Sequence, residues 1–158
     1  MCSSNHAPYA SAFALAQRPL VFEMPEAIVS LGEVVPVAPR ILPKDPAAAE
    51  VAQDVFRTAD AVLFAANGIV TVGPDLETAF LRMELVEHYA RIRAVMHGPV
   101  GAPVPLNAEG RERLLGLRKK AGLHLEGAPT LTATSNVTVG LRDVVAQEVR
   151  QAFKGKIS

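Results

Sequence analysis

The sequence predicts an α/β domain in which helices pack on a small central sheet. Three neighbouring segments lead to this prediction. Ala61 to Ala65 is a continuous apolar run, as in a strand covered on both faces. Asn67-Gly68 then matches the two-residue type I′ turn, and Ile69 to Val72 is the returning strand. A long helix is expected over Asp75 to Met96, because apolar residues recur along one side of it.

The segments before this hairpin predict two helices and a strand. Tyr9 to Ala16 is rich in alanine, and Pro8 suits the first turn of a helix. Val34 to Ala38 is short and β-branched, so we expect a strand, and Pro36 places that strand at an edge or a bulge. Ala47 to Ala59 repeats its apolar residues at helical spacing.

The segments after the long helix predict two further helices. Asn107 is suited to cap a helix that runs to Lys120. Thr130 to Thr134 alternates threonine with apolar residues, which is a weak strand signal, and Gly140 to Phe153 has an amphipathic helical pattern. We therefore expect one domain over residues 1–158, with 121–158 as a C-terminal extension that ends in a helix.

Charge and cysteine content exclude several classes of protein. The chain has 16 Lys and Arg against 16 Asp and Glu, so no basic surplus indicates nucleic-acid binding, and self-association meets little electrostatic repulsion. Cys2 is the only cysteine, which excludes an intrachain disulfide and a cysteine-rich zinc site. No secretion signal begins the chain, and no apolar stretch reaches the ~20 residues that span a bilayer. A cytoplasmic protein without a membrane partner is expected.

Two segments carry a resemblance to a known family. Asn5 to Leu20 reads NHAPYASAFALAQRPL, and Ala61 to Ile92 reads AVLFAANGIVTVGPDLETAFLRMELVEHYARI. Both resemble the class II aldolase/adducin family, and the resemblance covers roughly residues 4 to 120. It implies a three-layer class II aldolase-like domain, here truncated at the N-terminus. It also implies a homo-oligomer, commonly a tetramer with sites between subunits.

The resemblance also implies a metal site, held in the family by three histidines around a divalent ion, usually zinc. Two come from a His-x-His pair on a strand, and the third comes from an Asn-His-Gly turn. Here the pair falls on Ser4 and His6, and the third position is Asn67. Serine and asparagine are poor zinc ligands beside imidazole, so we expect a degenerate site with no cofactor, or zinc or another divalent metal if the protein is active. The family's acidic base lies upstream of the pair, and only three residues precede Ser4.

Three functions remain open on these residues. The first is a non-catalytic relative that acts through protein contacts. The second is a metal-dependent aldehyde-lyase or epimerase acting on a small sugar phosphate, with its missing site residues supplied from elsewhere. The third is a module that binds a small molecule without chemistry. The substitutions at Ser4 and Asn67 favour the first or the third.

Several residues also have plainer structural interpretations. Asn67 is expected chiefly as a turn former, and His6 as a vestigial ligand position. Glu84 and Glu87, with Arg82 nearby, are expected to form a solvated salt-bridge face on the long helix. Because the family's upstream segment is missing, the strand Ala61 to Ala65 is expected to lose a neighbour or a covering layer, so that another copy or another chain covers it. A sequence incomplete at its start is the alternative.

Overall fold

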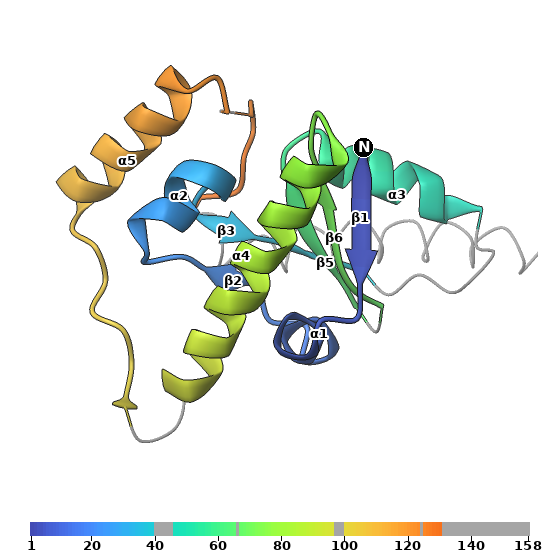
Figure 1. Ribbon diagram of the computed structural model, residues 1–158, viewed down its shortest axis with the longest axis horizontal. Helices are drawn as coiled ribbons and strands as arrows, with labels where there is room; N and C mark the ends of the chain where they lie inside the picture. The colour runs from blue at the N-terminus through green and yellow to red at the C-terminus, as the bar shows by residue number, and fades with distance from the viewer. Residues whose placement is uncertain (40–45, 66, 97–99, 124, 131–158) are drawn as a thin grey trace, which may run out of the picture.

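The computed structural model describes residues 1–39, 46–65, 67–96, 100–123 and 125–130 (Figure 1). A small sheet lies between two layers of helix, which confirms the predicted α/β fold class. The strands are β1 (Cys2–Asn5), β2 (Leu20–Val21), β3 (Val34–Val35), β4 (Val37–Ala38), β5 (Ala61–Phe64) and β6 (Gly68–Val72). The helices are α1 (Pro8–Leu15), α2 (Pro25–Leu31), α3 (Ala47–Phe56), α4 (Leu76–Val95) and α5 (Ala108–Lys120).

The main sheet has the strand order β1-β6-β5-β4. β6 runs antiparallel to both β1 and β5, whereas β4 runs parallel to β5. β5 is thus paired on both sides, and the prediction that it loses a neighbour is wrong. β2 and β3 form a separate antiparallel pair.

The β5–β6 hairpin differs from its prediction in the turn. Phe64 pairs with Gly68, and Leu63 pairs with Ile69, so Gly68 belongs to the strand rather than to a two-residue turn. Three residues, 65–67, therefore connect the strands, and the amide of Asn67 donates a 2.9 Å hydrogen bond to the carbonyl of Phe64. The predicted two-residue type I′ turn is wrong because the connection has three residues and ends before Gly68, which pairs with Phe64.

Side chains of β5 and β6 alternate between two apolar clusters, as the pleat of a strand requires. Ala61, Leu63 and Ile69 are buried in the cluster that includes residues of α1, α2 and α4. Val62 points to the opposite face and packs with Val55 and Phe56 of α3. In Figure 1, α4 crosses in front of the sheet, and α3 lies beside β5 on the other side.

Pro36 interrupts the segment that was expected as one strand. Val34 and Val35 pair with β2, whereas Val37 and Ala38 pair with β5 at the edge of the main sheet. The carbonyl of Pro36 accepts a 2.9 Å hydrogen bond from the amide of Leu63, so the break removes a donor but keeps an acceptor. The prediction of an edge position is confirmed.

The predicted cap of α5 is present, and α4 is capped by Asp75, which was expected as the first residue of that helix. The carboxylate of Asp75 accepts a 2.6 Å hydrogen bond from the amide of Thr78, and the side-chain oxygen of Asn107 accepts one of 2.8 Å from the amide of Gly110. Both residues hold extended backbone angles just before their helices. The hydrogen bonds explain why α4 and α5 begin where the sequence indicated.

Two elements of the structure were not predicted, and two predicted elements lie wholly or partly outside the residues that the structure describes. The sequence analysis did not identify β2 or α2. The predicted strand over Thr130 to Thr134 lies outside the described residues beyond position 130, and the helix over Gly140 to Phe153 lies outside them entirely. Within the described ranges, no helix has the length and apolar character needed to cross a bilayer.

Candidate functional site

The family's three ligand positions come together at one end of the β1–β6 pair. Ser4 lies in β1 opposite Val70, and His6 follows directly after that strand. The Cα of His6 lies 3.3 Å from the point that a Cβ on Gly68 would occupy, and Asn67 precedes Gly68 in the chain. The fold therefore brings Ser4, His6 and Asn67 into one neighbourhood, although they come from segments more than sixty residues apart.

The donor set at these positions does not fit a zinc ion. Ser4 offers a hydroxyl, His6 an imidazole and Asn67 an amide, and all three residues are exposed. Structural and catalytic zinc sites take at least three ligands from imidazole, thiolate or carboxylate groups. Among the residues that the structure describes, no three His, Cys, Asp or Glu side chains are grouped so that they could hold a metal ion. We derive no chemical step through a metal here.

Gly68 allows the close approach that forms this neighbourhood. Its φ is +92°, and a Cβ at this position would lie 2.5 Å from the carbonyl oxygen of Asn5. Only glycine accepts both the left-handed backbone and the contact. The glycine of the hairpin is thus required by the packing of β1 against β6, as well as by the turn.

Ser11 of α1 places a further polar group, not predicted as a site residue, close to Gly68. Its hydroxyl oxygen is buried without a hydrogen-bond partner in the described part of the chain, and it lies 3.1 Å from the Cβ position of Gly68. No signal in the sequence distinguishes this serine from the other small residues of α1.

Glu87 fills the N-terminal end of α1, beside His6. Its two carboxylate oxygens accept hydrogen bonds from the amides of Tyr9, at 3.0 Å, and Ala10, at 2.8 Å. This corrects the prediction that Glu87 belongs to a solvated salt-bridge face. Because the free amides of a helix N-terminus are a usual anion site, the carboxylate leaves little room for a phosphate there.

Arg82, which was expected on the same solvated face of α4 as Glu87, is buried. Its side chain donates a 3.0 Å hydrogen bond to Asp60, which a second guanidinium, that of Arg118, also contacts at 2.8 Å. The expectation of a solvated arginine is wrong because α4 turns this position toward the start of β5. The buried ion pairs hold the helices to the sheet at the end opposite the His6 neighbourhood.

A second polar cluster lies around Tyr89. The hydroxyl of Tyr89 donates to the carbonyl of Val21 and accepts from the amide of Glu23, both at 2.9 Å. Burial raises the pKa of Tyr89 above its ordinary value of 10.0, while the hydrogen bond from Glu23 opposes that rise. Arg111 bridges Glu23, at 2.9 Å, and Glu33, at 3.3 Å. These groups satisfy one another and tie α5 to β2.

Comparison with solved structures supports the fold seen here. A structure described as L-fuculose 1-phosphate aldolase is similar with a TM-score of 0.66 and 27% identity, over 77% of this chain and 55% of that one. YgbL of Klebsiella pneumoniae, a proposed aldolase/epimerase/decarboxylase, has a TM-score of 0.62 and 23% identity over 72% of this chain and 56% of its own. YgbL of Escherichia coli gives 0.60 and 24% over the same shares. The chain thus spans little more than half the length of these structures.

Comparison of sequences identifies the family. No curated protein matches the chain. The family model for the class II aldolase and adducin N-terminal domain matches residues 5–94, which is more than half of the 158 residues. The match includes both His6 and Asn67 and ends within α4. The chain therefore belongs to the class II aldolase and adducin N-terminal domain family.

Proposed function

We propose that this protein acts by binding a protein or a small molecule, without metal-dependent catalysis. One observation carries the proposal: at the junction of β1, α1 and β6, the three positions that the family uses for metal ligands hold only one imidazole, that of His6. Ser4 and Asn67 bring neutral oxygens in place of the other two. A single imidazole with a hydroxyl and an amide binds zinc weakly. The exposed Cys2 and the absence of other cysteines agree with a reducing compartment, and we propose the cytoplasm.

Metal analysis tests this proposal directly. We expect purified wild-type protein to carry no stoichiometric zinc, cobalt or manganese. The double variant Ser4→His with Asn67→His restores three imidazoles around the same neighbourhood. It should bind about one zinc per chain, measured by atomic emission after dialysis. The gain would show that the scaffold still presents the three positions and that the two substitutions remove the metal.

A neighbouring serine provides the matched control. In a strand, side chains alternate between faces, so Ser3→His with Asn67→His places its new imidazole on the opposite face of β1 from His6. This control should bind zinc far more weakly than the Ser4→His double variant. Stoichiometric metal in the wild-type protein, lost on His6→Ala, would contradict the proposal.

The alternative function is a metal-dependent lyase or epimerase on a small sugar phosphate. The observation that favours it is the similarity to the structure described as L-fuculose 1-phosphate aldolase. The ligands missing at Ser4 and Asn67 would have to come from a neighbouring chain or from an upstream segment. Aldol cleavage of a panel of sugar phosphates, with added zinc, would establish this alternative; no turnover together with no bound metal would exclude it.

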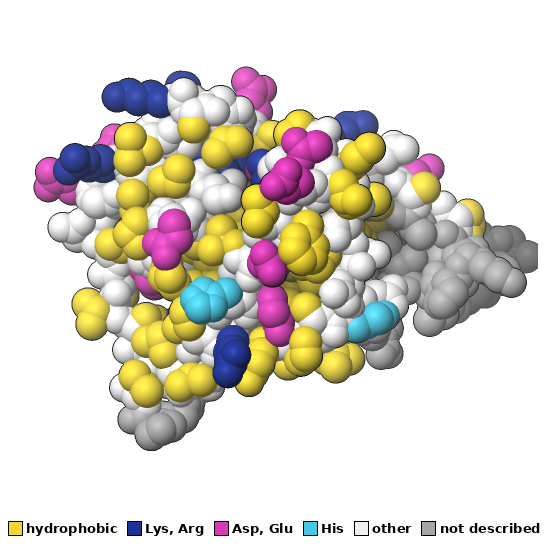
Figure 2. Space-filling model, in the orientation of Figure 1, with side chains coloured by type: hydrophobic (Ala, Val, Ile, Leu, Met, Phe, Trp, Pro, Cys, Tyr) yellow, Lys and Arg dark blue, Asp and Glu magenta, His cyan; other side chains and the backbone are white. Residues whose placement is uncertain are grey.

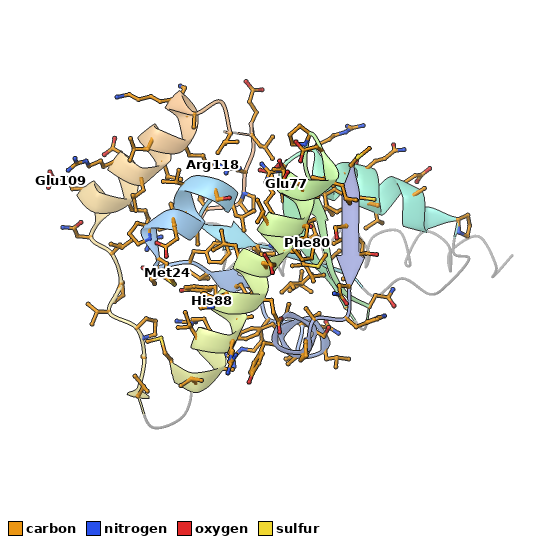
Figure 3. The ribbon with its side chains drawn as sticks, viewed as in Figure 1. Met24, Glu77, Phe80, His88, Glu109 and Arg118 are labelled. Carbon is orange, nitrogen blue, oxygen red and sulfur yellow. The ribbon has the colours of Figure 1, made fainter. Side chains whose placement is uncertain are left out.

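We also propose that the chain self-associates, with a tetramer as the assembly the family resemblance implies. Large apolar side chains lie exposed on α4: Leu76 is 57% exposed, Phe80 49% and Leu81 55%. Figure 2 shows hydrophobic side chains gathered over this helix, and Figure 3 shows Phe80 on its outer side next to β1. Exposed apolar patches of this kind mark contact surfaces.

Light scattering after gel filtration tests the association. Wild-type protein should elute as an oligomer, and Phe80→Ser should shift it toward the monomer. Leu117→Ser, at a residue of α5 that is 47% exposed, is the control and should leave the mass unchanged. A stable wild-type monomer at high micromolar concentration would exclude self-association.

A further inference from the structure

A pocket of about 310 Å³ lies between the C-terminal end of α2, one side of α5 and residues 128–130. It is distant in the fold from His6 and lies on a different set of elements. Leu115, Gly116, Ala128 and Pro129 give it apolar walls. The volume is at the lower end of the range of small-molecule sites, which suits a ligand of modest size.

Arg118 lies at the base of this pocket, and one of its three guanidinium nitrogens makes no hydrogen bond in the described residues. The residue is 2% exposed. One terminal nitrogen of the guanidinium donates to the carbonyls of Val29 and Ser30, and the other donates to Asp60. The third guanidinium nitrogen, Nε, has no hydrogen-bond partner in the described residues. A buried guanidinium N–H without a partner is costly, so it indicates a missing acceptor.

The space beside Gly32 leads to this donor. Gly32 lines the pocket with φ at +91°, and among the described residues other than its chain neighbours, only Nε of Arg118 lies within 4 Å of its Cβ position, at 3.8 Å. A side chain at position 32 would fill this space. Because glycine adds no side chain here, a ligand oxygen that enters this space can reach Nε once the surrounding side chains move slightly, since Nε itself is buried in the fold. Figure 3 places Arg118 between α5 and α2.

The charges around the pocket favour an acidic ligand at this point. Glu33 is engaged by Arg111 at 3.3 Å, so that carboxylate is already neutralised. Glu112 and Lys119 are exposed residues that line the pocket from α5. Lys119 directly follows Arg118 in α5, whereas Glu112 precedes it by six residues, which is between one and two helical turns. A charged oxygen acceptor such as a carboxylate forms a shorter and stronger hydrogen bond with a guanidinium than a neutral acceptor does.

We propose that this pocket binds a small carboxylic acid with a short apolar body. The carboxylate accepts a hydrogen bond from Nε of Arg118 in the space beside Gly32, and Lys119 attracts it from the rim. The apolar body packs on Leu115 and Pro129. The site is separate from the family's metal positions, so it does not depend on the function proposed above.

Nuclear magnetic resonance tests the site with 4-methylpentanoate as the probe. The Nε–H resonance of buried Arg118 should move during a titration of the full chain and reach saturation at millimolar probe. The neutral 4-methylpentanamide, which has the same apolar body, should bind at least ~5-fold more weakly, since it lacks the charge. Equal binding of acid and amide would overturn the carboxylate assignment. No shift of the Nε–H resonance would overturn the site.

Variants of α5 show whether the ligand occupies the pocket. At Gly116, a Cβ would meet no atom of the described residues within 4 Å, so Gly116→Leu can fold normally and fill the pocket. It should abolish the titration. Gly116→Ala should retain binding. Lys119→Ala should weaken it ~5-fold, and Lys120→Ala, at an exposed neighbour that does not line the pocket, should not change it. Binding unaffected by Gly116→Leu would place the ligand elsewhere and overturn the proposal.

Discussion

Asp60 accepts a 2.8 Å hydrogen bond from Arg118, and this contact joins helix α5 to the start of β5. The same carboxylate accepts a 3.0 Å bond from Arg82 of α4. The backbone carbonyl of Asp60 accepts a hydrogen bond from the amide of Val72, at the end of β6. A single acidic residue therefore connects two helices with two strands, inside a part of the molecule that water scarcely reaches.

Asp60→Asn should destabilise the fold strongly. An amide keeps the size of the carboxylate but loses its charge, so two buried guanidinium groups face each other without an anion. Removing one partner of a buried ion pair typically costs about 3–5 kcal/mol, and we expect a loss in that range in urea unfolding. Asp54→Asn is the control. Asp54 pairs with Arg57 at 3.8 Å with both side chains largely exposed, and it should cost less than about 0.5 kcal/mol. Similar losses for the two variants would contradict the role assigned to Asp60.

Gly68→Ala should also destabilise the protein, at the junction that brings His6 to Asn67. The new methyl would lie 2.5 Å from the carbonyl oxygen of Asn5, and the alanine would have to keep the backbone φ of +92° that glycine adopts here. We expect a loss of at least about 2 kcal/mol, with faster hydrogen exchange in β1. Gly116→Ala, in open space on α5, should instead raise stability by about 0.5–1 kcal/mol. A stable Gly68→Ala variant with slow exchange in β1 would show that this close approach is not required.

The sequence predicted the parts of the fold that depend on local patterns. Asn107 caps the helix that it was expected to cap, because capping depends on a residue and its next three amides, and the long helix begins directly after Asp75, one residue from its expected start. The buried run of β5 and its return in β6 were also correct, whereas the turn was one residue longer than the Asn-Gly signal suggests. The two-residue strand β2 was missed because it has almost no periodicity of its own; it exists through its pairing with Val34 and Val35.

The surroundings of the candidate site could be predicted only in part. The resemblance placed Ser4, His6 and Asn67 at corresponding positions, and the register of β1 on β6 brings these positions together. The role of Glu87 could not be predicted, since the amides it binds lie more than seventy residues away in the chain. The partnership of Arg82 with Asp60 likewise depends on how α4 packs, and helical spacing alone suggested a solvated face.

Gln17→Gly should stabilise the protein. Gln17 ends α1 with φ at +52°, and it is the only residue other than glycine with a positive φ in the described part of the chain. The amide of Arg18 donates to the carbonyl of Phe13 at 3.0 Å, which is the hydrogen bond of a helix end that prefers glycine. Relief of the left-handed conformation should add about 0.5–1 kcal/mol in thermal or urea unfolding. Gln53→Gly, within α3, should instead cost about 1 kcal/mol. A loss at both positions would contradict the strain assigned to Gln17.

Tyr89→Phe should remove the two hydrogen bonds that join α4 to the segment around β2. Tyr89 is only 2% exposed. Without its hydroxyl, the carbonyl of Val21 and the amide of Glu23 each lose their hydrogen-bond partner. We expect a loss of about 1–3 kcal/mol near neutral pH in urea unfolding. Tyr9→Phe, at an exposed tyrosine, is the control and should have little effect.

The pH dependence of stability separates the roles of this tyrosine further. Burial raises the pKa of Tyr89 above 10.0, so the folded protein holds the phenol proton more tightly than the unfolded chain does. The contribution of the neutral phenol is therefore complete below pH 10 and is lost as the pH rises through the folded pKa. Wild-type protein should lose stability over that alkaline range, whereas Tyr89→Phe should lose less. Absorbance at 295 nm should show one tyrosine titrating late in the folded wild type and absent from the variant. Parallel stability curves for the two proteins above pH 10 would show that Tyr89 ionises as freely in the fold as in the unfolded chain.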